Sequence, residues 1–227
     1  MREGIKVTQS QASDIEKQTR GQSKSPRWKE ERQWRITGSR FGEICRATDR
    51  RDKDSLALSI FKPANLDHVP AVQHGRTYEA SAIEKFKVKT GKDVSACGLF
   101  VDPDYPFLGA SPDGIVHNED SVIEVKCPFA GKDSMIRPGK NFGFLEFVDQ
   151  DQEQYRLKRT HPYYYQVMGE MKLSKRNKCY FIVFTLKDLF YEEINLDEEF
   201  FTSNMLPALK EFYYQYYLPL VATSLLD

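Results

Sequence analysis

Apolar residues recur with two different periods along this chain, a period of two over short stretches and a period near 3.6 over longer ones. The short stretches and two continuous apolar runs predict strands at residues 94–101, 107–109, 122–127, 177–185 and 189–195. The longer pattern predicts helices at residues 40–46, 75–90, 161–171 and 200–220. Elements in this order predict an α/β domain with a central mixed β-sheet flanked by helices.

Two segments fit neither period. Residues 1–27 are polar with almost nothing to bury, and we interpret them as an N-terminal arm that is helical at residues 13–19 or disordered. Residues 131–157 form a long mixed segment, which is uncommon inside a compact domain unless it is functional. The remaining length fits one domain, residues 28–227.

The charge is balanced overall, with 33 Lys and Arg against 33 Asp and Glu, but it is unevenly distributed. Residues 1–80 hold 16 Lys and Arg and 11 Asp and Glu, which leaves 17 against 22 for the remainder. A basic front half is compatible with a groove for nucleic acid on one side, although most charge runs are simply solvated faces.

The sequence indicates neither a membrane nor a secreted location. The longest apolar run, near residues 180–186, is too short to span a bilayer, and the first residues lack the hydrophobic stretch of a signal peptide. The four cysteines are scattered without a Cys-x-x-Cys pair, which argues against a structural zinc site. We therefore expect no membrane partner, and an intracellular, reducing compartment with free thiols.

Candidate chemistry is concentrated in residues 109–129, GASPDGIVHNEDSVIEVKCPF. On the strand expected there, Glu124 and Lys126 point to one face and Val125 to the other. Asp113, Glu124 and the backbone carbonyl of Val125 would form a hard-oxygen site suited to Mg²⁺, for which Mn²⁺ could substitute. Lys126 could orient a water or neutralise charge on a phosphate, so the set suits phosphodiester hydrolysis. Taken separately, the two halves also have structural readings, a hairpin turn and a strand with one polar face.

Together, Pro-Asp at 112–113 and Glu-Val-Lys at 124–126 resemble the PD-(D/E)XK nuclease signature. The longer forms, Ser-Pro-Asp-Gly and Glu-Val-Lys-Cys-Pro-Phe, resemble the YqaJ-type viral recombinase family of lambda exonuclease-like enzymes. The resemblance implies a restriction-endonuclease-like core over residues 28–227. It also implies a Mg²⁺-dependent DNA nuclease, a 5′→3′ exonuclease that acts on double-stranded DNA ends in recombination. Residues 131–157 would then be a lid or strand-separating loop over DNA.

Three further motifs match the family in order. A motif that contains Arg32 and ends at Ser39 matches one whose arginine and serine hold the 5′-phosphate of the DNA. Without the family, Ser39 reads as a helix N-cap and Arg32 as a packed stem. Glu79 matches a glutamate that lies beside the metal, and Gln166 matches a glutamine that reaches the catalytic centre. Met168 stands where the family often has a second glutamine.

By this resemblance the catalytic residues are Asp113, Glu124, Lys126, Gln166 and Glu79. Two alternatives stay open: a structure- or sequence-specific endonuclease built on the same core, and a catalytically idle module that binds DNA ends. The intact Asp, Glu and Lys set argues against the idle module. The resemblance also suggests a homotrimer and a single-strand annealing recombination protein as partner. The reducing compartment expected from the free thiols would be the cytoplasm, or the nucleus in a eukaryotic host.

Overall fold

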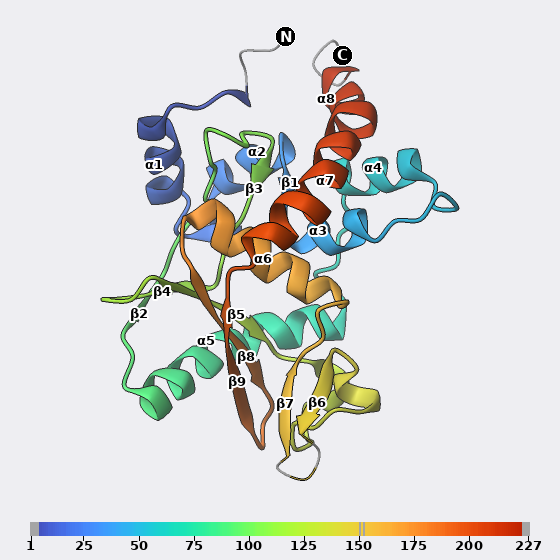
Figure 1. The fold of residues 1–227 in the computed structure, drawn as a ribbon. Coiled ribbons are helices and arrows are strands. Elements are labelled where there is room, and N and C mark those ends of the chain that lie inside the picture. The colour runs from blue at the N-terminus through green and yellow to red at the C-terminus, as the bar shows by residue number, and fades with distance from the viewer. Residues whose placement is uncertain (1–4, 150, 152, 224–227) are drawn as a thin grey trace.

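A computed structural model describes residues 5–149, 151 and 153–223. Its centre is a five-stranded sheet in the order β2-β4-β5-β8-β9 (Figure 1). These strands are β2 (Val94–Ser95), β4 (Gly114–Val116), β5 (Ser121–Lys126), β8 (Lys178–Phe184) and β9 (Leu189–Asn195). β5 and β8 run parallel and the other neighbours run antiparallel, so the sheet is mixed, as predicted.

The α-helices of the described residues lie before, between and after these strands. They are α1 (Gln9–Gln18), α2 (Pro26–Gln33), α3 (Gly38–Cys45), α4 (Lys53–Phe61), α5 (Pro70–Thr90), α6 (Pro162–Ser174), α7 (Leu206–Phe212) and α8 (Leu218–Thr223). α3, α5 and α6 confirm three predicted helices, with ends shifted by a few residues. The closing helix is confirmed as one helical run, because π-helical turns at Phe200–Met205 and Tyr213–Tyr217 adjoin α7 and α8.

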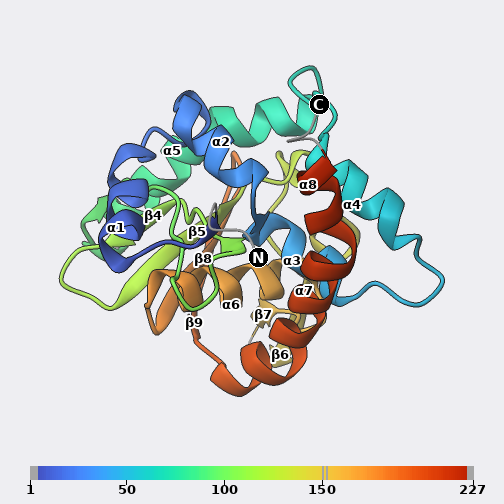
Figure 2. The same ribbon diagram turned by 90° about the horizontal axis from the view of Figure 1, so that it is seen from above.

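Helices cover both faces of the central sheet, and Figure 2 shows the sheet between α5 and α6. Side chains of β5 alternate between the two layers: Ile123 packs with Phe86 of α5, whereas Val122 belongs to the cluster that includes Val167 of α6. Because alternate residues of a strand share a face, Glu124 lies on the α6 side with Val122. The predicted architecture, a mixed sheet flanked by helices, is confirmed.

A close crossing of α3 over α6 depends on two glycines. A Cβ atom on Gly42 would lie 2.4 Å from Cα of Pro162, and one on Gly169 would lie 2.2 Å from the ring of Phe41. Any larger residue would push the helices apart, because neither the backbone nor a buried ring can give way by that much. The crossing brings the N-terminal end of α3 against the face of α6 that carries Gln166 and Glu170.

The strand predicted at residues 94–101 forms only at Val94–Ser95, apart from an isolated antiparallel bridge between Phe100 and Ala110. Two of its backbone N–H groups bond to the N-terminal helix instead of a strand: Gly98 N donates to Glu16 Oε1 at 3.0 Å, and Leu99 N to Thr19 Oγ1 at 2.7 Å. The predicted strand near residue 108 does form, as β3 (Leu108–Gly109), but it pairs with β1 (Ile36–Thr37) outside the central sheet. Backbone groups that find side-chain partners have no need of a sheet ladder.

The N-terminal segment contributes buried side chains. Ile15 of α1 is 2% exposed and clusters with Leu99 and Val101. The helix begins with a capping box at Thr8. The Thr8 hydroxyl accepts from the backbone N–H of Gln11, and the Thr8 backbone N–H donates to the Gln11 side chain. The segment is therefore more ordered than its composition suggests, and its separation from the domain at residue 28 stays a prediction.

The long segment at 131–157 contains a hairpin of β6 (Leu145–Asp149) and β7 (Gln154–Leu157). Its base is anchored because Leu157 N donates to Glu192 Oε2 on β9 at 2.6 Å. Phe142 is buried before the hairpin, while Phe147 on it is 42% exposed. The segment is thus a projecting hairpin on a packed base, and its role as a lid or strand separator stays a prediction.

The structure also bears on two expectations from the sequence, the one about membrane-spanning segments and the one about free thiols. Among the described residues, no helix is long and apolar enough to cross a membrane. Cys45, Cys97, Cys127 and Cys179 are all free, as predicted.

Candidate active site

The β4–β5 hairpin brings Asp113 beside β5. Asp113 immediately precedes β4, and its Oδ2 accepts a hydrogen bond of 2.7 Å from the backbone N–H of Val125. Its own N–H donates to the carbonyl of Ile123 at 3.0 Å. A carboxylate thus reaches across the hairpin to the strand that carries Glu124, although the two acids lie eleven positions apart.

Glu124, Lys126 and Gln166 form one hydrogen-bonded unit. Lys126 Nζ donates to Glu124 Oε1 at 2.6 Å and to Gln166 Oε1 at 3.1 Å. Gln166 Nε2 donates to the same Glu124 Oε1 at 2.6 Å. The structure therefore brings together these predicted residues from β5 and α6, with Glu124 only 3% exposed.

Glu170 is a member of this network that the sequence analysis missed. It lies one helical turn after Gln166, is 1% exposed, and its Oε1 accepts from Gln166 Nε2 at 2.8 Å. The spacing of four on one helix face was a usable signal, since such residues are neighbours. Met168, by contrast, is fully buried in the hydrophobic core, so its position does not serve the site.

Negative charge is in excess at this site. Burial raises the pKa of Asp113 well above its ordinary value, and the charges of Glu124 and Glu79 raise it further. Burial, and then Glu124, likewise raise the pKa of Glu79 and, more strongly, that of Glu170. A cluster of carboxyl groups whose charges raise one another's pKa values is typical of sites that bind a cation.

Lys126 alone does not balance these acids. Burial by itself would lower the pKa of Lys126, but the attraction of Glu124 and other neighbours outweighs it and raises that pKa. The ammonium also lies 4.4 Å from the centre of the Tyr163 ring, a cation–π contact. Lys126 is therefore held as a cation on two sides, by carboxylate and by ring.

The residues present fit a divalent metal ion. Glu124 Oε2 is buried without a hydrogen-bond partner among the described residues, which leaves it available as a ligand. Over the same residues, no group of three or more His, Cys, Asp and Glu side chains could hold an ion by itself. The predicted set has two acidic side chains, Asp113 and Glu124, with the Val125 carbonyl and waters as further ligands, because Mg²⁺ keeps several waters. The role of the Val125 carbonyl stays a prediction.

A hollow of about 960 Å³ contains the predicted phosphate-binding residues Arg32 and Ser39. The guanidinium of Arg32 stacks 4.0 Å from the centre of the Trp28 ring. Burial and the charge of Arg40 lower the pKa of Arg32 to about 10. Positive charge thus converges on a concave surface, as an anion site requires.

Two arginines near this hollow differ in their partners. Arg35 is 2% exposed and is bound by Glu31 Oε2 at 2.6 Å and by the carbonyl of Pro106 at 3.0 Å. Arg32 forms no ion pair with any described residue. Arg35 is therefore a structural residue, whereas the Arg32 fork is free to bind a ligand.

Ser39 lies in the first turn of α3, after the N-cap residue Thr37, so the alternative interpretation of Ser39 as the N-cap is wrong by two positions. The start of α3 also adjoins the hydrogen-bonded network of Gln166 and Glu170: a Cβ atom on Gly38 would lie 3.6 Å from Glu170 Oε1. The hollow and the carboxylate cluster are therefore neighbours, joined by one helix terminus, which favours anions.

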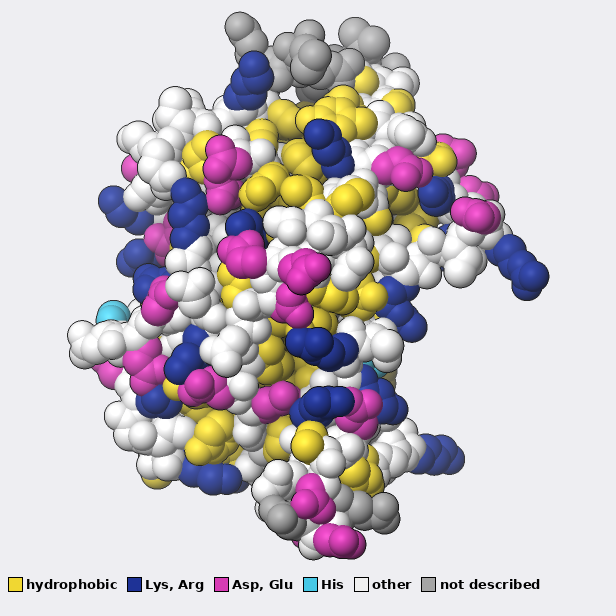
Figure 3. Space-filling view, in the orientation of Figure 1, with side chains coloured by type: hydrophobic (Ala, Val, Ile, Leu, Met, Phe, Trp, Pro, Cys, Tyr) yellow, Lys and Arg dark blue, Asp and Glu magenta, His cyan; other side chains and the backbone are white. Residues whose placement is uncertain are grey.

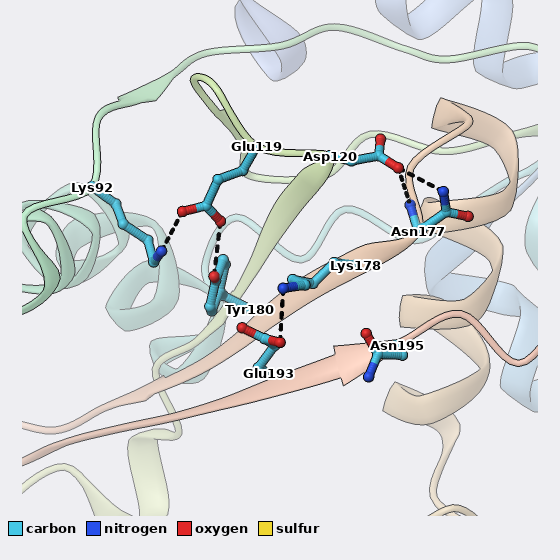
Figure 4. A pocket seen from close by; sticks show the side chains of 8 residues that line it. All are labelled: Lys92, Glu119, Asp120, Asn177, Lys178, Tyr180, Glu193 and Asn195. Atoms are coloured by element: carbon cyan, nitrogen blue, oxygen red, sulfur yellow. Dashed lines mark hydrogen bonds and ion pairs between the residues drawn. The ribbon is translucent and has the colours of Figure 1, made fainter.

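A second hollow of about 410 Å³, shown in Figure 4, lies at the start of β8, beside Lys178. Its charged side chains satisfy one another: Glu119 accepts from Lys92 and Tyr180, and Lys178 pairs with Glu193 at 2.8 Å. The groups of this hollow are self-neutralised, so it offers no comparable chemistry.

The chain was compared with protein-family models, curated proteins and solved structures. A family model described as the YqaJ-like viral recombinase domain matches residues 27–177. No curated protein matches the chain. The matched region contains every predicted site residue.

Solved structures share the fold. The alkaline exonuclease LHK-Exo from Laribacter hongkongensis is 21% identical, with 86% of this chain and 96% of that chain covered and a TM-score of 0.62. A SOX–DNA complex is 14% identical over 91% and 70% of the two chains, with a TM-score of 0.60. A KSHV SOX–RNA complex is 12% identical over 91% and 73%, with a TM-score of 0.63. At these identities the likeness establishes the fold.

Proposed function

The chain belongs to the YqaJ-like viral recombinase family of DNA-hydrolysing enzymes, and on this premise we propose that it is a Mg²⁺-dependent 5′→3′ exonuclease on double-stranded DNA ends. The observation that carries the proposal is the unit of Glu124, Lys126 and Gln166 beside Asp113, with Glu124 Oε2 unpartnered. A degenerate, idle copy of the fold would have no reason to keep these groups buried and mutually bonded, since each costs desolvation free energy.

In this proposal Asp113, Glu124 and the Val125 carbonyl hold the metal ion, with Glu79 as an accessory acid beside it. A bound divalent ion lowers the pKa of a water and stabilises charge on the leaving oxygen. Lys126 orients the attacking water and offsets charge that develops on the scissile phosphate. Gln166 keeps Lys126 in place, because its amide bonds to Lys126 and Glu124 together.

The hollow around Arg32 and Ser39 supports a preference for DNA ends. The free guanidinium of Arg32 and the N-terminal turn of α3 could together bind a terminal phosphate dianion. The neighbouring cluster of acids would then receive the first internucleotide bond of the same strand. This arrangement is the reason to propose an exonuclease rather than an endonuclease.

A nuclease assay on linear and covalently closed duplexes, with Mg²⁺ or EDTA, tests the proposal. We expect hydrolysis of the linear duplex with Mg²⁺, none with EDTA, and none of the closed circle. Cutting of the closed circle would indicate the structure- or sequence-specific endonuclease instead. Failure to cut either substrate, with binding retained, would indicate the idle end-binding module.

Mn²⁺ should substitute for Mg²⁺, since both accept carboxylate and carbonyl ligands. A single-strand annealing protein as recombination partner and an intracellular, reducing compartment belong to the same proposal. A closed homotrimer would make processive action possible by enclosing the DNA. Light scattering with and without duplex tests the trimer, and a monomer in both conditions would exclude it.

A further inference from the structure

Groups that can bind an anion also surround the N-terminal end of α6, outside the phosphate hollow. His161 is the N-cap of α6, and its Nδ1 accepts a hydrogen bond of 3.2 Å from the backbone N–H of Tyr163. Because Nδ1 accepts, the proton of the neutral ring is on Nε2, which leaves one N–H donor for a ligand.

This imidazole lies close to the catalytic ammonium. Its ring centre is 4.5 Å from that of Tyr163, whose own centre is 4.4 Å from Lys126 Nζ. One aromatic ring therefore separates His161 from Lys126. A strand whose scissile phosphate contacts Lys126 would place a neighbouring phosphate within reach of His161.

Two cations flank His161. The crossing of α3 over α6 at Gly42 and Pro162 brings the C-cap residue of α3, Arg46, beside the start of α6. Lys158 lies three residues before His161 and donates to the backbone carbonyl of Gly143 at 2.6 Å. Within the described part of the chain, neither Arg46 nor Lys158 has an ion pair.

The positive charge of these residues also affects the pKa of the imidazole. Burial, followed by the positive charges of Arg46, Lys158 and Lys126, lowers the pKa of His161 to about 4. None of the groups that shift this pKa is an acid. Figure 3 shows Lys and Arg side chains along the right-hand indentation, between the part that carries α4 and the part that carries the β6–β7 hairpin.

We propose that Arg46, Lys158 and His161 form a second phosphate-binding site, which holds an internucleotide phosphodiester of the strand beyond the catalytic centre. The proposal rests on the proposed function. Arg46 offers a bidentate fork, Lys158 a point charge and His161 one directed N–H. The site and the Arg32 hollow lie at opposite ends of α3, so the strand is held on both sides of the cut.

Duplex binding in EDTA, measured by fluorescence anisotropy at several salt concentrations, tests the site without cleavage. Arg46→Ala removes an exposed fork, and His161→Asn keeps an N-cap acceptor while it removes the Nε2–H donor. Each should weaken binding roughly three- to tenfold at every sequence, and Arg46→Ala should reduce the salt slope by about one. Arg176→Ala, which removes the same charge beyond the other end of α6, should change neither quantity. The preference for a 5′-phosphate should stay as in wild type.

Binding of both variants with the wild-type affinity and salt slope would overturn the proposal. If wild type binds no duplex, the proposed function fails, and inorganic phosphate becomes the probe. Imidazole NMR signals of His161 should then shift with phosphate, but not with chloride at equal ionic strength, and should not shift in Arg46→Ala. No shift would show that the site binds no phosphate. A shift that persists unchanged in Arg46→Ala would show that phosphate binds without Arg46 and would overturn the proposal.

Discussion

Trp28 Nε1 donates a hydrogen bond of 2.9 Å to Ser111 Oγ. Trp28 stacks on Arg32 in the phosphate hollow, while Ser111 begins the Ser-Pro-Asp-Gly turn that carries Asp113. This bond ties the residue proposed to recognise the DNA end to the residue proposed to bind metal, across 83 positions of sequence. The bond therefore connects the proposed phosphate hollow directly to the turn that carries Asp113.

Loss of charge at the proposed metal site should strongly reduce hydrolysis without unfolding the protein. Asp113→Asn and Glu124→Gln keep shape but remove a ligand charge, so turnover should fall by roughly two orders of magnitude or more. Initial rates with Mg²⁺ measure this, and circular dichroism checks the fold. Near-normal turnover in Asp113→Asn would show that the metal is held elsewhere.

Lys126→Ala should reduce turnover roughly 100- to 1,000-fold while DNA affinity changes little. One ammonium adds little to affinity among many phosphate contacts, but it acts at the reacting phosphorus. Single-turnover rates and binding isotherms in EDTA separate the two effects. Equal losses in binding and in turnover would mark Lys126 as a docking residue.

Glu170 should act as a positioning residue for Gln166. It accepts from Gln166 Nε2 and so fixes which end of the amide faces Lys126. Glu170→Gln keeps a carbonyl acceptor and should retain most activity, whereas Glu170→Leu should lower kcat about tenfold with KM nearly unchanged. The kcat and KM values of the pair check this. Equal activity in both variants would leave Glu170 with a packing role.

Arg32→Ala should remove the preference for 5′-phosphorylated over 5′-hydroxyl ends. A dianion gains more from the free guanidinium than a hydroxyl does, because charge-assisted hydrogen bonds are roughly twice as strong as neutral ones. The measurement is the ratio of initial rates on the two substrates. Arg27→Ala, which removes the same charge from the same helix, serves as the control. A ratio near one in wild type would place the pocket elsewhere.

Stabilisation by Mg²⁺ should increase with pH. Asp113, Glu79 and Glu170 have raised pKa values in the folded chain, so their folded state binds protons more tightly than the unfolded one. Their contribution to stability is present below the ordinary carboxyl pKa of about 4 and is lost as pH rises through the raised values. A divalent ion offsets the resulting repulsion.

Thermal unfolding with Mg²⁺ and with EDTA, between about pH 5 and 8, measures this difference. In wild type, the difference between Tm with Mg²⁺ and Tm with EDTA should increase toward high pH. In Asp113→Asn, which lacks one of the repelling charges, this difference should be smaller than in wild type. A gap that is independent of pH would contradict the assignment of these acids to a cation site.

The sequence by itself determined the local part of the site. The period of two on a strand places Glu124 and Lys126 on one face, and the Pro-Asp-Gly turn before β4 positions Asp113, because both depend on neighbours a few residues away. The helices and the sheet class followed from the same short-range rules.

Tertiary structure decided the rest, because those contacts join residues far apart in sequence. The N–H groups of Gly98 and Leu99 bond to α1, which ended a strand that local alternation predicted. The sequence does not distinguish the roles of Arg32 and Arg35, yet the guanidinium of Arg35 is already bound by Glu31 and by the carbonyl of Pro106. Periodicity describes which face a side chain occupies, whereas only packing determines the partner it meets there.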